Sequence, residues 1–347
     1  MVIKDQISVD AQILIFQMNL RTLNCVQGNN RRQAVIEYTL IIAAFAGGYT
    51  GKSTDMIIDS HLHLPWEADT MEAKREALLA ELDRNGAEKG LVIADSVPVS
   101  VIGSVRDCAG LFRGSSRIKV AAGISPLSDY EQQLAYCREL LEAGDIAGLK
   151  LYTGHERFYC TDERLEAVYS MAEEFSVPVL FHTGWDDPEY SAPEKMRELA
   201  VSHPRSLFVY CHCFYPDPER CFSVLGDCGN VFFDTSSVAD DEKLIPVLKP
   251  VFERAVAQMP ERMIFGSDFG SCSQEAHLRF AAGLDMSSRQ RELFMHGNAE
   301  RLYGFYCVGR IYFEMNGVVF YAQELHTYAY LKPAVGIRHR QDGTPRL

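Results

Sequence analysis

Two histidines placed two positions apart follow an apolar pair in the first part of the chain. Ile57-Ile58 leads into the acid Asp59, and His61 and His63 come shortly after it. In an extended strand alternate side chains face the same way, so both imidazoles can be presented to one point. Neutral imidazole is a common ligand for zinc and related divalent metals. The pair therefore indicates a metal site if other ligands reach the same point.

Three further residues of ligand type each stand at the C-terminal end of an apolar run: His182, His212 and Asp268. Each alone has a structural explanation, because an aspartate at a strand end can cap the next helix and a histidine can bond a backbone carbonyl. Four separate apolar runs that all end in such residues make a shared metal site the better interpretation.

From Met56 onward, short apolar runs alternate with longer stretches of helical periodicity. Eight strands alternating with helices over about 250 residues predict a (β/α)8 barrel, or TIM barrel, whose active site lies at the C-terminal strand ends. A doubly wound open sheet is the alternative, but no dinucleotide-type glycine fingerprint follows the first strand. Strands are predicted at 56–60, 90–95, 118–124, 147–152, 177–182, 207–212, 230–235 and 262–268, and helices at 70–85, 100–113, 129–144, 162–175, 193–202, 217–225, 240–258, 273–284 and 287–304.

The barrel pattern spans 56–305, and the segments on either side of it are predicted to be separate from it. Residues 1–55 form an N-terminal extension that we expect to lie outside the barrel. In the short C-terminal extension, 306–347, two strand-like runs flank Asn316-Gly317. Such a pair is typical of a two-residue turn, so the sequence predicts a β-hairpin there.

Composition and charge exclude several classes of partner. Hydrophobic residues make up 47% and charged residues 23%, as in a globular protein, and the net charge of −13 argues against nucleic acid or an anionic membrane as a partner. No segment reaches the roughly 18–20 apolar residues that span a bilayer. Tyr38–Ala46 has the outline of an export signal, but a long lead and the acid Glu37 argue against it.

The ten cysteines are scattered without a C-x-x-C pair, so we expect reduced thiols and a cytoplasmic protein. Cys211-His212-Cys213 invites a thiolate metal site. On a strand, however, the two cysteines should face away from His212, which argues against that site.

The ordered motifs of the chain resemble those of the amidohydrolase superfamily. The similarity is greater to its amidohydrolase-related group, which includes aminocarboxymuconate-semialdehyde decarboxylase. The resemblance covers about Met56 to Phe305 and implies a metal-dependent (β/α)8 enzyme. It implies metal ligation by His61, His63, His182 and Asp268, with His212 polarising the substrate or binding a second metal. The motifs are I-D-S-H-x-H, G-L-K-L-Y, F-H-T-G, Y-C-H, G-S-D-F and H-G-N-A-E-R-L.

The chemistry of such a site requires these residue types. Imidazole and carboxylate hold a divalent cation and leave room for water, whose pKa then drops to roughly 7. Asp268 can be both a ligand and the acceptor of a proton from that water, and His212 can donate to a developing oxyanion. Zinc is the first expectation, although manganese, iron or cobalt also suit histidine and carboxylate.

Lys150 and the loop residues are expected to contact the substrate. In several superfamily members a lysine at the end of strand 4 is carboxylated and bridges two metals, whereas an unmodified Lys150 would pair with a substrate carboxylate. We favour one metal, because an ammonium would repel a second cation. Tyr152, Trp185 and Asp186 are the other predicted substrate-binding residues. Further loop candidates are Trp66, His155, Tyr215 and Ser271, whereas structural or surface roles are assigned to His203, His277, His326 and His339.

Three functions remain compatible with these residues. The first is a metal-dependent hydrolase that cleaves a C–N, ester or lactone bond in a small molecule. The alternative is a non-oxidative decarboxylase, in which Lys150 or Arg157 would bind the departing carboxylate. Asp186 and Asp187 would repel an anionic substrate and favour the hydrolase. The third is a metal-binding barrel without activity. Whether the protein is a homo-oligomer is left open.

Overall fold

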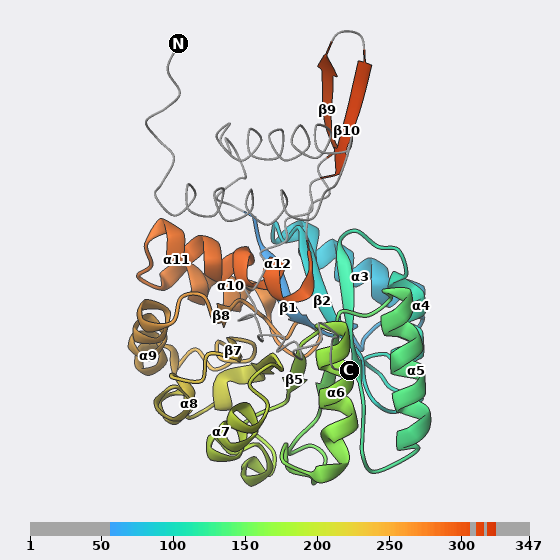
Figure 1. Ribbon diagram of the computed structural model, residues 1–347. Coiled ribbons are helices and arrows are strands. Elements are labelled where there is room, and N and C mark those ends of the chain that lie inside the picture. Colours follow the sequence, from blue (N-terminus) through green and yellow to red (C-terminus); the bar gives the residue numbers. More distant parts are fainter. Residues whose placement is uncertain (1–55, 306–309, 316–317, 324–347) are drawn as a thin grey trace, which may run out of the picture. The chain divides into compact units, whose positions relative to one another are not determined.

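Eight short parallel strands pair in sequence order, from β1 to β8, in the computed structural model, which describes residues 56–305, 310–315 and 318–323. They form the TIM barrel that the sequence predicts (Figure 1). Strands that are covered on both faces read as continuous apolar runs, which explains the pattern. The strands are β1 (Ile58–Leu62), β2 (Lys89–Ile93), β3 (Ile118–Gly123), β4 (Gly148–Leu151), β5 (Val179–Phe181), β6 (Phe208–Tyr210), β7 (Val231–Asp234) and β8 (Met263–Ile264).

The barrel closes between β8 and β1 through a few hydrogen bonds rather than a regular ladder. The Asp268 backbone N–H donates to the His61 carbonyl at 2.9 Å, and the His63 N–H donates to the Phe269 carbonyl at 2.7 Å. Leu62 and Phe269 also form an isolated parallel bridge. The closure therefore brings the His-x-His segment and the Gly-Ser-Asp-Phe segment side by side.

An irregularity in β1 turns His61 and His63 toward the barrel interior. The register with β2 contains one extra β1 residue between Asp59 and Leu62. Ile58, before this bulge, packs in the interior cluster, whereas Leu62 packs between the barrel and the helices. A bulge reverses which face the following side chains occupy. Both histidines therefore point into the barrel.

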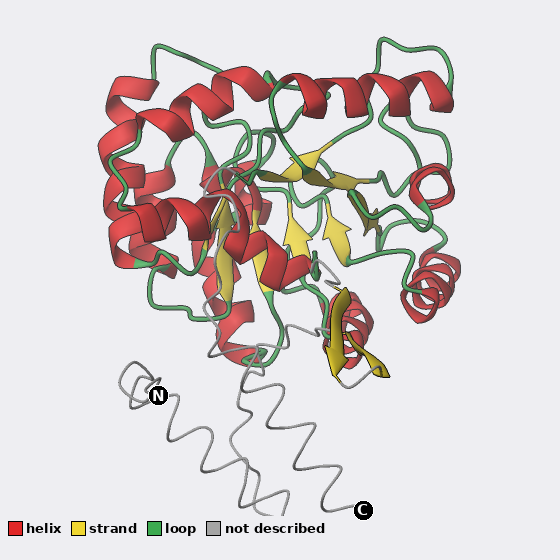
Figure 2. Ribbon diagram, turned by 90° about the horizontal axis from the view of Figure 1, so that it is seen from above, coloured by secondary structure: helices red, strands yellow, loops and turns green. Residues whose placement is uncertain are grey.

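Helices surround the strands, as the view along a perpendicular direction shows (Figure 2). At the start of α3, Thr70 Oγ1 accepts from the Ala73 N–H at 3.1 Å, and Gly144 ends α5 in the left-handed region, with a φ of 73°. No helix in the described ranges is long and apolar enough to cross a membrane. The helices are α3 (Met71–Arg84), α4 (Val105–Phe112), α5 (Tyr130–Ala143), η1 (Glu163–Leu165), α6 (Glu166–Phe175), η2 (Pro188–Ser191), α7 (Pro193–Ser202), η3 (Cys211–Phe214), α8 (Pro218–Leu225), α9 (Ile245–Gln258), α10 (Gln274–Gly283), α11 (Ser288–Glu292), η4 (Leu293–Gly297) and α12 (Asn298–Tyr303).

Three helix predictions need correction. The helix predicted at 100–113 begins only at Val105, after the N-cap Ser104. The helix predicted at 240–258 begins only at Ile245, where a proline in the first turn favours a helix start. The helix predicted at 287–304 is divided by the π-helical turn η4. Within that turn the Phe294 carbonyl accepts from the Phe265 N–H of the barrel at 3.0 Å. A contact with the barrel wall, which periodicity does not reveal, therefore interrupts the helix.

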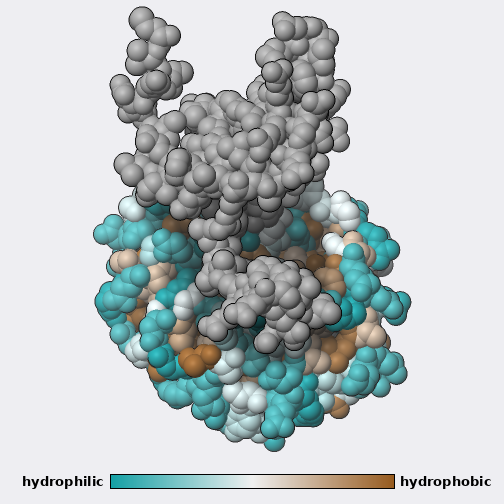
Figure 3. All heavy atoms as spheres, in the orientation of Figure 1, coloured by the Kyte–Doolittle hydropathy of each residue, from teal (hydrophilic) through white to brown (hydrophobic). Residues whose placement is uncertain are grey.

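Two apolar clusters hold the barrel together. One fills its interior, and the other lies between the strands and the surrounding helices. On the face shown in Figure 3, the described surface is mostly hydrophilic, which accords with this burial. Side chains of α12 join the interior cluster, so that helix contributes to the filling of the barrel. Interior residues include Ile58, Leu91, Ile93, Leu180, Val209, Phe232, Ile264, Leu302 and Tyr303.

The predicted extensions are described only in part. β9 (Arg310–Met315) pairs antiparallel with β10 (Val318–Gln323), where the sequence predicts the strands of a hairpin. The intervening Asn316-Gly317 pair and the extension 1–55 lie outside the described residues.

His277 gives the fold a dependence on pH. It is buried on α10, its Nδ1 donates to the Ser273 carbonyl at 2.8 Å, and its Nε2 accepts from the Ala239 N–H at 3.2 Å. Burial lowers the pKa of His277, so the folded protein keeps it neutral while the unfolded chain protonates it near pH 6.5. Its contribution to stability is therefore present above about pH 6.5 and is lost as the pH falls below that value. Urea unfolding at pH 7.5 and pH 5.0 should show a smaller loss of stability in His277→Gln than in the native protein; an equal loss would contradict this role.

Candidate metal centre

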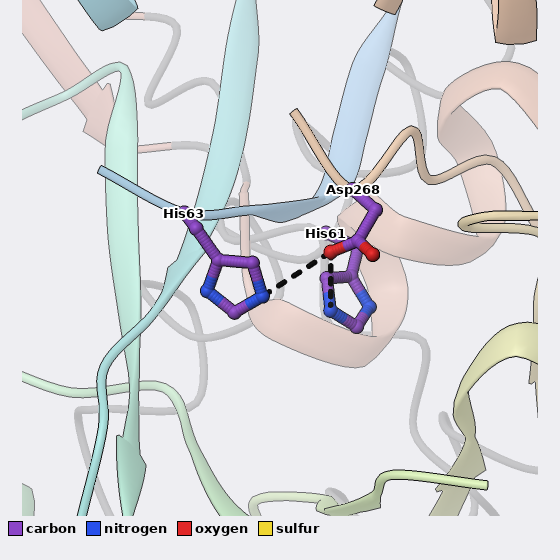
Figure 4. Close-up of side chains that lie close together, drawn as sticks. All are labelled: His61, His63 and Asp268. Carbon is purple, nitrogen blue, oxygen red and sulfur yellow. Dashed lines mark ion pairs between the residues drawn. The ribbon is translucent and has the colours of Figure 1, made fainter. Parts of the chain in front are cut away.

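Three buried side chains converge where β8 meets β1. His61 Nε2 lies 3.4 Å and His63 Nε2 lies 3.2 Å from the same oxygen, Asp268 Oδ1 (Figure 4). One ligand atom from each of the three residues lies within 4.8 Å of the other two. Both imidazoles point toward the carboxylate, as the bulge and the closure of the barrel require.

The hydrogen bonds around these groups leave their lone pairs facing one another. His61 Nδ1 donates to Asp234 Oδ2 at 2.6 Å, and His63 Nδ1 donates to the Ile93 carbonyl at 3.0 Å. Each Nε2 is then an unprotonated acceptor that faces another acceptor, Asp268 Oδ1. Acceptors at this distance repel each other unless a cation lies between them.

Buried atoms without partners support the same conclusion. His61 Nε2, Asp268 Oδ1 and His182 Nε2 are all buried and have no hydrogen-bond partner. Unpaired buried polar atoms are rare and costly. Two imidazole nitrogens and a carboxylate oxygen are the donor set that a divalent transition metal prefers. The residues present therefore fit the metal that the sequence predicts.

The charge states of these groups suit metal binding. Burial lowers the pKa of His61, places that of His182 well below its usual value and takes that of His212 to about 3. Burial alone would raise the pKa of Asp268, but a positive charge on His61 and a hydrogen bond from His63 would lower it well below the ordinary aspartate value, and a bound cation would supply the same attraction. These directions favour neutral imidazoles at His61, His182 and His212 and an ionised carboxylate at Asp268, which are the forms that bind a cation.

His212 reaches the site by an unexpected backbone path. The strand predicted at 207–212 ends at Tyr210, and alternation along it would turn His212 outward. Instead His212 has a φ of 62°, in the left-handed region that few residues other than glycine adopt. Its Nε2 lies 3.1 Å from His182 Nδ1, and its Nδ1 lies 2.8 Å from Ser236 Oγ. The prediction that strand 6 continues through His212 is therefore wrong, because a left-handed turn returns the ring to the interior.

The phase of β6 changes the interpretation of the neighbouring cysteine, because Val209 and Cys211 share the interior face. Cys211 packs in the barrel interior, with Sγ within 4.8 Å of ligand atoms of His61 and Asp234. The expectation that alternation keeps Cys211 away from the site is thus wrong. Burial nevertheless raises the pKa of its thiol to about 12, and a protonated thiol is a poor metal ligand.

The sequence matches the amidohydrolase family over residues 58–305. The chain belongs to the amidohydrolase family. The match covers the whole barrel, and with it every residue of the candidate metal centre. It agrees with the resemblance that the motifs carry. No curated protein matches the chain.

Solved structures share the fold of this amidohydrolase. An uncharacterized TIM-barrel protein from Bordetella bronchiseptica superposes with a TM-score of 0.59 at 21% identity, covering 72% of this chain and 99% of its own. 4-Oxalomesaconate hydratase from Rhodopseudomonas palustris gives a TM-score of 0.54 at 15% identity, covering 72% of this chain and 96% of the hydratase. 5-Carboxyvanillate decarboxylase from Novosphingobium aromaticivorans, solved with bound manganese, gives a TM-score of 0.54 at 11% identity. The superposition covers 74% of this chain and 99% of the decarboxylase. At these identities the likeness concerns the fold.

The structure brings only part of the predicted ligand set together. His61, His63 and Asp268 form the close group. His182 instead contacts His212 and groups with His155 and Asp186, within 4.8 Å of ligand atoms of both. Its unpaired Nε2 keeps it available as a fourth ligand.

The predicted substrate-binding residues lie in two different environments. Lys150 and Tyr152 are buried; Lys150 Nζ lies 3.3 Å from Cys211 Sγ, and the Tyr152 hydroxyl donates to the Ala94 carbonyl at 3.2 Å. Trp185 is half exposed and stacks on Tyr215, with ring centroids 4.8 Å apart. Asp186 pairs with His155. The loop pair is therefore the more accessible to a substrate.

Sequence reasoning missed Asp234 and Asp59. Asp234 ends β7 and accepts from His61, while Asp59 accepts from the Ser267 hydroxyl and the Gln274 amide at 2.6 and 2.7 Å. Through these hydrogen bonds Asp59 fixes the position of Ser267, the residue directly before Asp268. A signal for Asp234 was present, because it is an acid at the end of a predicted strand, like Asp268. Asp59 belongs to the I-D-S-H-x-H motif, but nothing in that motif indicated its contact with Ser267.

Proposed function

We propose that this protein is a metal-dependent hydrolase that cleaves a C–N, ester or lactone bond in a small molecule. The observation that carries the proposal is the convergence of His61, His63 and Asp268 with buried, unpaired ligand atoms. The proposed ligands are these three residues and His182. Zinc is the first candidate, and manganese is the ion in one similar structure.

A divalent cation held here would supply a water molecule whose pKa is lowered toward neutrality. Asp268 is placed to accept the proton from that water at Oδ2, because Oδ1, which faces His61 and His63, would bind the cation; Oδ2 also accepts from Ser237 Oγ at 2.6 Å. The same carboxyl can return the proton to the leaving group. His212 is the proposed donor to a developing oxyanion; its Nε2 lies 3.1 Å from His182 Nδ1, and the ring must release this contact to reach a substrate.

Decarboxylation is the second candidate, and the loop charges bear on it. Asp186 pairs with His155 at 2.6 Å, and Asp187 pairs with Arg157 at 2.8 Å. The Arg157 guanidinium therefore offsets the charge of Asp187, whereas burial lowers the pKa of His155, so the expected repulsion of an anionic substrate remains at Asp186. Arg157 is equally engaged, so it is a weaker candidate for binding a carboxylate. Lys150, as the unmodified ammonium that we propose, retains that role.

We further propose one metal ion and a cytoplasmic location. Lys150 Nζ contacts the Cys211 thiol, so an unmodified ammonium would stand beside the site and disfavour a second cation. The eight cysteines of the described ranges are all free, which supports a reducing compartment.

Oxygen-18 water distinguishes the two reactions. The metal-loaded protein would be screened against lactones, esters, amides and cyclic carboxylic acids, and the active compound incubated in labelled water. A hydrolase is expected to place one labelled oxygen in the product carboxylate. Release of carbon dioxide with no label in the organic product would contradict hydrolysis and establish the alternative. Asp268→Asn protein serves as the control for background reaction.

A further inference from the structure

The loops that follow β4 and β5 place a second imidazole against His182. The rings of His155 and His182 have centroids 3.8 Å apart and planes inclined by 35°. On its edge, His182 Nδ1 lies 3.1 Å from His212 Nε2. One face of the His182 ring is therefore covered by His155, and its Nδ1 has a hydrogen-bond partner. The buried His182 Nε2 has none.

We infer that His155 and Asp186 are positioning residues that hold the His182 ring so that Nε2 faces the cation. This inference rests on the proposed function, because it takes His182 as a metal ligand. A ligand whose ring plane is fixed before binding loses less freedom when the metal arrives.

Asp186 fixes the orientation of His155. Asp186 Oδ2 lies 2.6 Å from His155 Nδ1, so the stacked ring cannot rotate without losing this contact. Asp186 itself stands between two residues with positive φ, Trp185 at 44° and Asp187 at 31°. Such conformations cost about 1–3 kcal/mol each and persist only where the surroundings impose them. The loop is thus held in a shape that points Asp186 at His155.

Close backbone contacts impose that shape. A Cβ on Gly154 would lie 2.5 Å from the Asp186 carbonyl, so the two loops approach as only glycine allows. Arg157 Nε also donates to Asp187 Oδ2 at 2.8 Å, which joins the same two loops a second time. The position of His155 and Asp186 is therefore fixed by contacts between the backbones and side chains of two loops, and not by one side chain alone.

The alternative is that these residues ligate an ion of their own. Ligand atoms of His155, His182 and Asp186 do lie within 4.8 Å of one another. The lone pair of an imidazole nitrogen lies in the ring plane, however, and these two rings have centroids 3.8 Å apart and planes tilted by 35°, which sets their lone pairs beside each other rather than toward each other. They do not converge on one point, which favours positioning over ligation.

Cobalt binding tests the inference without a substrate. Co²⁺ affinity would be measured by chelator competition, and ligand geometry by the visible absorption of the bound ion. His155→Ala should weaken Co²⁺ binding by about 10- to 100-fold and shift the absorption bands. His155→Phe restores a stacked ring and should recover most of the affinity, while Asp186→Asn should fall between the two.

His203→Ala is the matched control, because His203 also pairs with a carboxylate, that of Glu166 at 3.2 Å, but on the surrounding helices. It should bind Co²⁺ like the native protein. Native affinity and an unchanged spectrum in His155→Ala would overturn the inference and leave the proposed function standing. Loss of one of two bound equivalents would overturn it in favour of a second ion. A native protein that binds no Co²⁺ would refute the proposed function, and this inference with it.

Discussion

Replacing Asp268 by asparagine is expected to lower kcat by about 10³-fold, because the residue is proposed as both ligand and proton acceptor. An amide oxygen can still approach the cation, but it cannot take up a proton at neutral pH. The asparagine side chain would keep the shape of the aspartate and its contact with Ser237 Oγ. The fold should therefore survive, and the loss should appear in kcat rather than in KM. Steady-state kinetics on the substrate found by the screen provides the measurement.

Asp241→Asn is the control for the loss of a carboxylate. Asp241 is exposed, and its carboxylate accepts from the Lys243 N–H at 3.0 Å within its own loop. Its replacement should leave kcat unchanged. If Asp268→Asn retained more than about a tenth of native kcat, general acid–base catalysis by this residue would be ruled out.

Asp234→Leu is expected to weaken both the fold and the metal site. The Asp234 carboxylate accepts from His61 Nδ1 at 2.6 Å and from the Ser236 N–H at 2.8 Å, and all three groups are buried. Leucine would leave the buried Ser236 N–H without its acceptor and would leave His61 Nδ1 with only Ser236 Oγ, 3.0 Å away, at a cost of about 1–3 kcal/mol in the free energy of unfolding. It would also release the His61 ring, so metal affinity should fall by about 10- to 100-fold.

Denaturant unfolding of the metal-free protein and metal titration measure the two effects separately. Asp83→Leu removes a carboxylate from an exposed ion pair with Arg117, 2.8 Å long, and should change neither quantity appreciably. Asp234→Asn keeps one acceptor and should lie between the native protein and Asp234→Leu. Native metal affinity in Asp234→Leu would show that the carboxylate does not orient His61.

The barrel was predictable because its signal is local and repeated. Each strand reads as an apolar run, and each helix has its own periodicity, as in 129–144, where α5 occupies Tyr130–Ala143. The β/α alternation then determines the order of strands and the end at which candidate ligands gather. His61, His63 and Asp268 were found for that reason, and the structure brings them together.

The details that aim the side chains were not predictable, because contacts between distant segments determine them. The bulge in β1 and the left-handed φ values of His212 and Asp268, 62° and 64°, have no counterpart in any periodicity. Gly266 is an example of such a contact between distant segments. A Cβ at this position would collide with the Asp234 carboxylate and lie 2.9 Å from the His61 Cβ. Only the folded barrel reveals that three strands approach so closely at this point.

Anomalous X-ray diffraction from crystals loaded with Zn²⁺ or Mn²⁺ tests the metal centre most directly. We expect one strong peak at about 2.0–2.2 Å from His61 Nε2, His63 Nε2 and Asp268 Oδ1, with His182 Nε2 completing the ligand set. The peak should vanish in His61→Ala crystals. A peak located only between His155 and Asp186, or no ordered metal in protein that has retained its fold, would contradict the account.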